Sequence, residues 1–274
     1  MKLPVVIVIP IYKKTISHAE ECSLKQCAEV FSGRHIAFVY PRGLDLDNYK
    51  ALFRKVPTVM FKPFPAQCFE NISSYNKMLL GVQFYKTFDA YEYILIYQTD
   101  AFVFSDQLDS WLKKGYHYVG SPIVLKAHND NLEFLPFGGN GGFSLRHVKA
   151  HLNVLKKNTI TDSPSAVMAY HRQFHKGLAL ILRAPLMVAR FLGFRNNSRF
   201  YIRQFSANED MFWSKKAMTI DKKFKPAPAS VEIAFAFEKY PSTLFEMNSR
   251  MLPFGCHAWE KYEPEFWKQF IPGA

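Results

Sequence analysis

The first hundred residues alternate between short apolar runs and longer segments with helical spacing. The run 5–10 is β-branched almost throughout, which is typical of a central parallel strand that is covered on both faces. Residues 17–31 place apolar side chains at helical intervals and have Gly33 just beyond their end, which predicts a helix. Strands at 35–40, 58–61 and 93–97 and helices at 47–54 and 73–88 continue the alternation. This order predicts an α/β fold with a mostly parallel central sheet flanked by helices.

The second half of the chain is less regular. A block of glycines around Asn140 leads into an expected strand, and a helix is expected to begin at Asn208. We expect a basic helical stretch at about 166–204, a strand at 234–238 and an aromatic tail at 252–262. Internal repeats and a low-complexity linker are absent from the sequence, which favours a single domain over 1–274 with a basic helical insertion at about 166–204.

Composition narrows the class of protein. The chain has 274 residues, of which 49% are hydrophobic and 16% aromatic, so it can bury a core and is not expected to be disordered. Its four cysteines are scattered and none has CxxC spacing, which argues against a disulfide scaffold or structural zinc. The apolar run 3–12 lacks a small-residue cleavage site, and charges or prolines interrupt the longest later run, 178–194. We therefore expect a cytoplasmic protein.

Charge points to anionic partners. Lys and Arg number 35 against 23 Asp and Glu, a formal net charge of +12. Seven of these cations lie within 170–203, where there is no acid: Arg172, Lys176, Arg183, Arg190, Arg195, Arg199 and Arg203. Leucine, isoleucine and phenylalanine are interleaved with them. A segment of this kind can lie on an anionic membrane surface or form a solvated insertion that covers the core, and both interpretations stay open. Nucleic acid ranks third, because no DNA- or RNA-binding motif accompanies the charge.

Candidate chemistry lies at strand ends, where open α/β sheets bind ligands. Pro10-Ile11-Tyr12 follows the first strand and Gln98-Thr99-Asp100 follows the strand at 93–97. A carboxylate at Asp100 can hold a hard divalent cation, or it can simply form a turn.

Three later motifs have similar double interpretations. The glycines of Gly138-Gly139-Asn140-Gly141-Gly142 indicate a close approach of the backbone either to a ligand or to a neighbouring strand. Asn208-Glu209-Asp210 can cap a helix or supply a general base. His257 is either a packed polar residue or a ligand.

In this order, the blocks resemble those of the GT-A-type nucleotide-sugar glycosyltransferases. The closer resemblance is to a family of uncharacterised, mostly microbial glycosyltransferase-like proteins, and it covers 5 to about 262 through the blocks VVIVIPIYK, YILIYQTDAFVF, GNGGFSLR, NEDMFWS and LPFGCHAWEKY. It implies a single GT-A-like, Rossmann-like domain that moves a sugar from a nucleotide-diphosphate sugar to a hydroxyl of a glycan or lipid-linked acceptor. A UDP-sugar is the first candidate donor.

The resemblance also implies roles for residues. GT-A enzymes bind a divalent cation, Mn²⁺ or Mg²⁺, through an Asp-x-Asp motif; here Gln98 stands for the first Asp, and Asp100 keeps the metal contact with His257 completing the shell. In the β1,4-galactosyltransferases a Gly-Gly strand lines the donor sugar and a following acid deprotonates the acceptor. Here Asn140, Gly141 and Gly142 match the Gly-Gly strand, and Glu209 and Asp210 match the following acid. The other expected contacts of the nucleotide sugar are Pro10, Tyr12, Tyr75, Asn76, Gln98 and Thr99.

The implied chemistry is simple. A cation stabilises the departing diphosphate, and a single carboxylate that takes the acceptor proton suffices for an inverting displacement, although the sequence leaves retention open. The rival hypothesis is a non-catalytic GT-A-like protein that binds anionic lipid or nucleic acid through the basic insertion. Such a binder has no need for Asp100, Glu209 and His257 together. An enzyme with this insertion is expected in the cytoplasm, peripherally at the inner face of the cell membrane.

Overall fold

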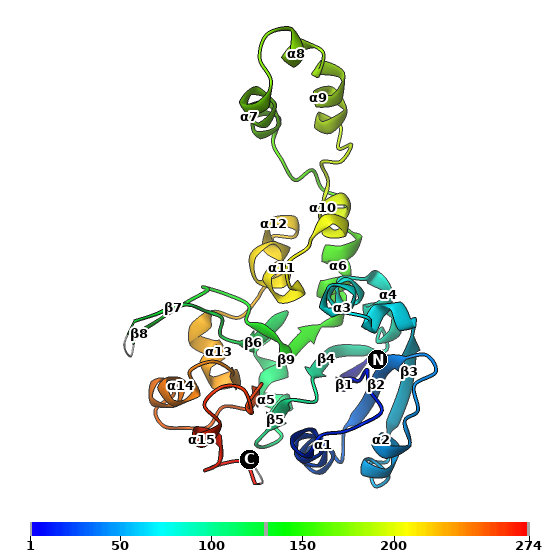
Figure 1. Ribbon diagram of the computed structural model, residues 1–274, viewed down its shortest axis with the longest axis vertical. Coiled ribbons are helices and arrows are strands. Elements are labelled where there is room, and N and C mark those ends of the chain that lie inside the picture. The colour runs from blue at the N-terminus through cyan, green and yellow to red at the C-terminus, as the bar shows by residue number, and fades with distance from the viewer. Residues whose placement is uncertain (1, 129–130, 273–274) are drawn as a thin grey trace.

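The computed structural model describes residues 2–128 and 131–272 and is built on a six-stranded sheet with the order β3-β2-β1-β4-β9-β6 (Figure 1). Only β9 runs against its neighbours; the other five strands are mutually parallel. The predicted α/β class with a mostly parallel central sheet is therefore confirmed. The strands are β1 (Leu3–Pro10), β2 (His35–Pro41), β3 (Val59–Phe64), β4 (Tyr91–Tyr97), β6 (Tyr118–Ser121) and β9 (Asn140–His147).

The β-branched run in β1 divides its side chains between two cores. Val5, Ile7 and Ile9 face one core and Val6 and Val8 face the other, as the two-residue repeat of a strand requires. Helices cover both faces, and Figure 1 shows α1 and α2 on the side of the sheet opposite α3 and α4. The first core contains α1 (His18–Val30), α2 (Asp47–Leu52) and α5 (Leu108–Lys113), and the second contains α3 (Ile72–Leu79), α4 (Val82–Thr87), α6 (Val148–Lys156) and α11 (Glu209–Lys215).

Two elements differ from the sequence-based expectation. The single helix expected at 73–88 is two helices, because α3 ends with Leu80 bonded back to Asn76 and Gly81 is extended before α4 begins. The strand expected at 234–238 is shorter than predicted: α13 (Ala229–Phe235) takes its first two residues, and only β10 (Ala236–Phe237) is extended. A short apolar run does not by itself distinguish a buried strand from a buried helix.

A small second sheet, β10-β11-β5, packs beside the end of β4. In it β5 (Ala101–Val103) pairs antiparallel with β11 (Gly255–His257), so the chain after β4 meets the chain from the aromatic tail. A third core forms beneath this sheet around Trp259 and Trp267. The remaining elements of the body are η1 (Ala66–Phe69), β7 (Val124–His128), β8 (Asn131–Phe134), α12 (Ala217–Ile220), α14 (Pro241–Met247) and α15 (Pro264–Trp267).

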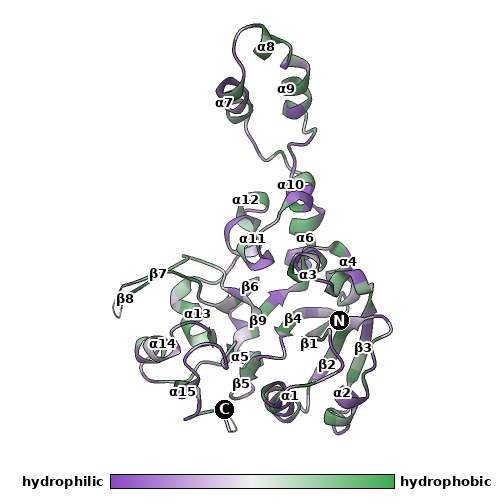
Figure 2. Cartoon of the chain, viewed as in Figure 1, coloured by the Kyte–Doolittle hydropathy of each residue, from purple (hydrophilic) through white to green (hydrophobic). Residues whose placement is uncertain are grey.

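The basic stretch expected at about 166–204 is helical. It forms α7 (Pro164–Phe174), α8 (Leu178–Ile181), α9 (Ala184–Phe191) and α10 (Ser198–Gln204), and the first three project away from the body (Figure 1). Figure 2 shows hydrophobic stretches on α8 and α9 in this projecting part. None of the helices in 2–128 and 131–272 has both the length and the apolar character that crossing a membrane requires.

One buried acid makes stability depend on pH. Glu232 of α13 is fully buried, and neither of its carboxylate oxygens has a hydrogen-bond partner among the described residues. Burial raises the pKa of Glu232 to about 8. The folded chain therefore holds a proton that the unfolded chain releases above its ordinary pKa of 4.5, and stability is lost as the pH rises from 4.5 through 8.

We expect Glu232→Gln to remove this loss. Urea unfolding at pH 5 and pH 8.5 should show the wild type losing as much as about 4 kcal/mol more stability between the two conditions than Glu232→Gln loses. Exposed Asp47→Asn serves as the control and should follow the wild type. Parallel pH dependence of wild type and Glu232→Gln would show that Glu232 does not carry the effect.

Candidate active site

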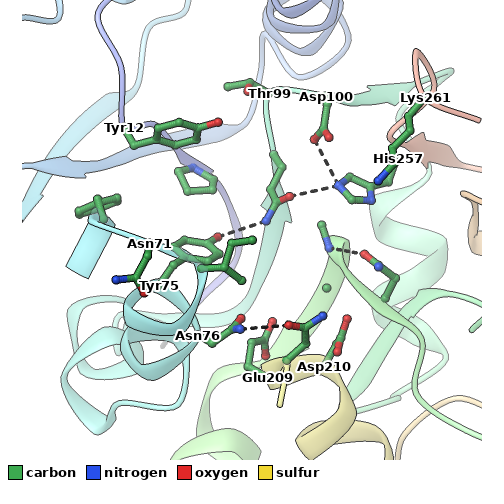
Figure 3. Close-up of a pocket in the computed structure, with 18 of the residues that line it drawn as sticks. Tyr12, Asn71, Tyr75, Asn76, Thr99, Asp100, Glu209, Asp210, His257 and Lys261 are labelled. Carbon is green, nitrogen blue, oxygen red and sulfur yellow. Dashed lines mark hydrogen bonds and ion pairs between the residues drawn. The ribbon is translucent and has the colours of Figure 1, made fainter. Parts of the chain in front are cut away.

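A cavity of about 710 Å³ lies at the carboxyl ends of β1 and β4, beside the start of β9 and α11 (Figure 3). The structure brings every site residue predicted from the sequence into its lining, and their roles stay predictions. These residues are Pro10, Tyr12, Tyr75, Asn76, Gln98, Thr99, Asp100, Asn140, Gly141, Gly142, Glu209, Asp210 and His257.

Strand register brings Asp100 and His257 together across the chain. His257 is the β11 partner of Ala101, and the Ala258 amide donates to the Asp100 carbonyl at 3.0 Å. As a result, Oδ1 of Asp100 lies 3.2 Å from Nε2 of His257, and Oε1 of Gln98 lies 3.1 Å from the same nitrogen. Figure 3 shows both contacts converging on the imidazole.

Acids on both sides hold a positive charge on this imidazole. Nδ1 of His257 lies 3.6 Å from Oε1 of Glu238, which follows β10. Burial alone would lower the pKa of His257, but the contact with Asp100 and the nearby negative charge of Glu238 outweigh it and raise the pKa to about 10. Burial opposes ionisation of Asp100 as well, and the His257 contact overcomes it and lowers the Asp100 pKa.

This corner has the ligands that a divalent cation needs. A carboxylate oxygen, an imidazole nitrogen and an amide oxygen meet within about one hydrogen-bond length. A cation bound here would have to displace the Nε2 proton of His257, after which all three atoms can serve as ligands. No cluster of three His, Cys, Asp or Glu side chains suited to a metal occurs among the described residues. A cation held at Asp100 and His257 would need further ligands from outside these side chains, such as the phosphates that bind nucleotide-bound magnesium.

Glu209 and Asp210 have opposite environments although they are adjacent at the start of α11. Both oxygens of Glu209 accept from Arg146 of β9, at 2.7 and 3.0 Å, and both side chains are buried. Arg146 is further held by the Ser144 hydroxyl and the Gly141 carbonyl. This bidentate, charge-assisted pair commits Glu209 to the wall of the cavity.

Asp210 has no such cation. Its Oδ1 accepts from the Met211 amide, and the rest of the carboxylate faces the cavity. Burial, assisted by the negative charge of Glu209, raises the pKa of Asp210 to about 6. A buried carboxylate with its pKa raised towards neutrality is suited to accept a proton.

The glycines give the cavity its floor. Any side chain at Gly142 would overlap the imidazole of His257, and a Cβ at Gly141 would lie 2.6 Å from Oε1 of Glu209. The backbone amide of Gln98 donates to the Gly142 carbonyl at 3.0 Å, which joins the end of β4 to the start of β9. The side chain of Asn140 accepts from the Gly142 amide at 2.8 Å and so shapes the same turn.

The opposite wall is aromatic and amide-rich. Tyr12 and Tyr75 lie on the same side of the cavity in Figure 3, away from Asp210. The side-chain amide of Gln98 donates to the Tyr75 hydroxyl at 3.5 Å, and the side-chain amide of Asn76 donates to Oδ1 of Asn208 at 3.3 Å. Asn208 is at the N-cap position of α11 but its side chain makes no capping bond, so the capping role considered for it from the sequence is absent.

Residues 58–257 match a family described as "Protein of unknown function (DUF5672)". This chain belongs to that family. The matched range includes Asp100, Arg146, Glu209, Asp210 and His257, so the DUF5672 region contains both the Asp100–His257 contact and the adjacent acids of α11. No curated protein matches the chain in sequence.

Some solved structures are similar to this DUF5672 chain at low identity. Mouse xyloside xylosyltransferase 1 in its apo form is 9% identical, with 94% of this chain and 97% of that chain covered and a TM-score of 0.47. Galactosyltransferase LgtC with donor and acceptor sugar analogues is 12% identical, with 92% and 86% covered and a TM-score of 0.45. Glycosyltransferase GlyE of Streptococcus pneumoniae TIGR4 is 12% identical, with a TM-score of 0.44; all of this chain is covered, but only 61% of GlyE. The function proposed below is accordingly derived from the cavity residues themselves.

Several functional candidates were not found from the sequence. Lys261, four residues after His257, lines the cavity, and Glu20 lines it while accepting from the Thr99 hydroxyl at 2.8 Å. Ser17 and Glu20 form a capping box for α1, and this motif can be recognised in the sequence. The sequence does not indicate that Glu20 also lines the cavity. The other lining residues are Phe69, Glu70, Asn71, Ile72 and Asn208, and Arg146 and Glu238 support the site from behind.

The two acids should separate in stability measurements. Glu209→Gln leaves the buried Arg146 without its countercharge and is expected to destabilise the fold by about 3–5 kcal/mol. Asp210→Asn removes a carboxylate whose ionisation folding disfavours, so above pH 6 it should be at least as stable as the wild type. Chemical unfolding at pH 7.5 measures both. Similar losses in the two variants would contradict the different environments described here.

Proposed function

We propose that this protein is a nucleotide-sugar-dependent glycosyltransferase that transfers with inversion. The observation that carries the proposal is the arrangement of the cavity. An unpaired, buried carboxylate, Asp210, lies on one wall, and the Asp100–His257 pair lies on another (Figure 3). A proton acceptor and a holder for a phosphate-bound cation thus border the same space.

The donor would occupy the cavity from the Tyr12 wall to the Asp100 corner. Tyr12, an exposed aromatic at the end of β1, offers a face for the nucleotide base, with Pro10 beneath it. The diphosphate would then reach Asp100, where Lys261 is a further positive charge in the lining. Gly141 and Gly142 would border the sugar, and their lack of side chains lets Glu209 and His257 lie directly against the strand.

Asp100 and His257 would hold a divalent cation, Mn²⁺ or Mg²⁺, with Gln98 beside them. When bound, the cation would offset the negative charge that develops on the leaving diphosphate. Glu238 would keep the imidazole oriented through Nδ1.

Asp210 would act as the general base. The acceptor hydroxyl oxygen attacks the anomeric carbon of the sugar, the bond from that carbon to the diphosphate oxygen breaks, and the electron pair leaves with the diphosphate. The hydroxyl proton passes to Asp210. Because Arg146 occupies both oxygens of Glu209, Asp210 is the acid of this pair that is free for the role, and direct displacement from one face inverts the anomeric centre. A glycan or a lipid-linked sugar would supply the hydroxyl.

Replacing the base should stop transfer without stopping donor binding. For Asp210→Asn we expect a loss of at least about a hundredfold in release of nucleoside diphosphate, the lower end of a general base's contribution. In the wild type the rate should rise with pH up to about 6 and level off above it, because the ionised carboxylate is the active form. Asp47→Asn, an exposed change, is the matched control. Full turnover by Asp210→Asn would remove the assignment.

Binding measurements alone can test whether Asp100 and His257 hold a cation. A thermal-shift screen of nucleotide sugars, with UDP-sugars first, should find a donor that stabilises the wild type in the presence of Mn²⁺ and much less in its absence. Asp100→Asn should lose the Mn²⁺-dependent part of that stabilisation while keeping its own fold. Calorimetry that gives Asp100→Asn and wild type the same donor affinity with Mn²⁺ would refute the cation assignment.

A further inference from the structure

Residues 160–197, here called the projecting hairpin, extend from the body through a narrow neck and carry α7, α8 and α9 (Figure 1). Ile160 and Asn197 form an antiparallel bridge at the neck. Next to it, buried Asn196 accepts from the Asp162 amide at 2.8 Å and donates to the carbonyls of Asp162 and Arg190 at 3.0 Å each. The hairpin is therefore held in place at its base by specific polar contacts.

The hairpin leaves most of its apolar side chains outside. Its α7 and α9 contact each other, but the apolar side chains that they bury are few, chiefly Val167 and Met187. In contrast, Leu192 is 82% exposed, Leu182 72%, Leu178 71% and Ile181 67%. Phe174, Phe194, Val188 and Tyr170 are exposed as well. Apolar side chains gathered in this way on one projection mark an interaction surface.

All but one of the charged side chains of the hairpin are positive. It contains five cations and one acid, Asp162, which pairs with Arg190 at 3.4 Å. The other four cations, Arg172, Lys176, Arg183 and Arg195, form no ion pair with any residue that the structure describes, and all four are exposed. Exposed aliphatic side chains thus stand among unneutralised positive charges.

We propose that the projecting hairpin docks on an anionic membrane surface. The aliphatic side chains of α8 and of the adjoining ends of α7 and α9 enter the boundary between headgroups and acyl chains, and the cations contact the anionic headgroups. Nucleic acid matches the charge but offers no comparable apolar layer for the leucines of α8. A second copy of the hairpin matches the apolar surface but repeats the positive charge.

Vesicle sedimentation tests the proposal with the full chain. Wild type should pellet with vesicles of phosphatidylcholine and phosphatidylglycerol and much less with phosphatidylcholine alone. Leu178→Asn with Leu182→Asn should lower the partition coefficient about tenfold or more, since each leucine loses its apolar burial. Lys176→Gln with Arg183→Gln should lower it about fivefold per charge, and salt should weaken wild-type binding.

Matched controls lie far from the hairpin on the body. Met251→Asn changes another exposed apolar residue, and Arg54→Gln with Lys55→Gln removes two exposed cations after α2; both variants should bind vesicles like the wild type. Unchanged thermal midpoints establish that all variants fold. Equal pelleting with neutral and anionic vesicles, or a duplex DNA that binds wild type and the leucine variant alike while vesicles do not bind, would overturn the proposal. So would a wild-type dimer that the leucine variant converts to a monomer in analytical ultracentrifugation.

Discussion

The buried ion pair between Arg146 and Glu209 is the interaction on which the cavity depends. It joins β9 of the central sheet to the first turn of α11, and it also fixes the Gly141 carbonyl through the same guanidinium. A guanidinium that is fully buried would cost several kcal/mol without a partner, so β9 and α11 are coupled. The position of Asp210, one residue further along α11, follows from that coupling. The ion pair of Glu209 thereby sets where the neighbouring Asp210 carboxylate lies in the cavity.

The pair also explains how adjacent acids acquire different properties. Glu209 has its charge neutralised at bonding distance, whereas Asp210 has the Met211 amide and the repulsion of Glu209. Asp100 is a third case, in which a protonated imidazole lowers the pKa despite burial. Three carboxylates around one cavity thus differ because of what each contacts, and not because of their residue type.

The central architecture and the membership of the cavity follow from the sequence to a large extent. Continuous β-branched runs such as Val5–Ile9 allow few alternatives, and ligand sites in such sheets lie at the carboxyl ends of strands. The local sequence pattern does not indicate which distant residues contact each other in the fold. Nothing near Glu209 in the sequence indicates Arg146, because the two meet only where α11 packs against β9. Likewise nothing near His257 indicates Glu238, because they meet only through the pairing of β10 with β11. The break at Gly81 and the helix ending at Phe235 were missed for a similar reason, since tertiary packing decides between conformations that a short apolar run permits equally.

The antiparallel pairing of β5 with β11 has a consequence for biosynthesis. Asp100 leaves the ribosome long before His257, and the contact between them closes a loop that includes β9, the projecting hairpin and α11. Contacts of such high sequence separation form late, because the entropy of loop closure must be met before they contribute stability. A nascent chain with the whole central sheet in place therefore still lacks the contact between Asp100 and His257, and this corner of the cavity is expected to form as one of the last events of folding.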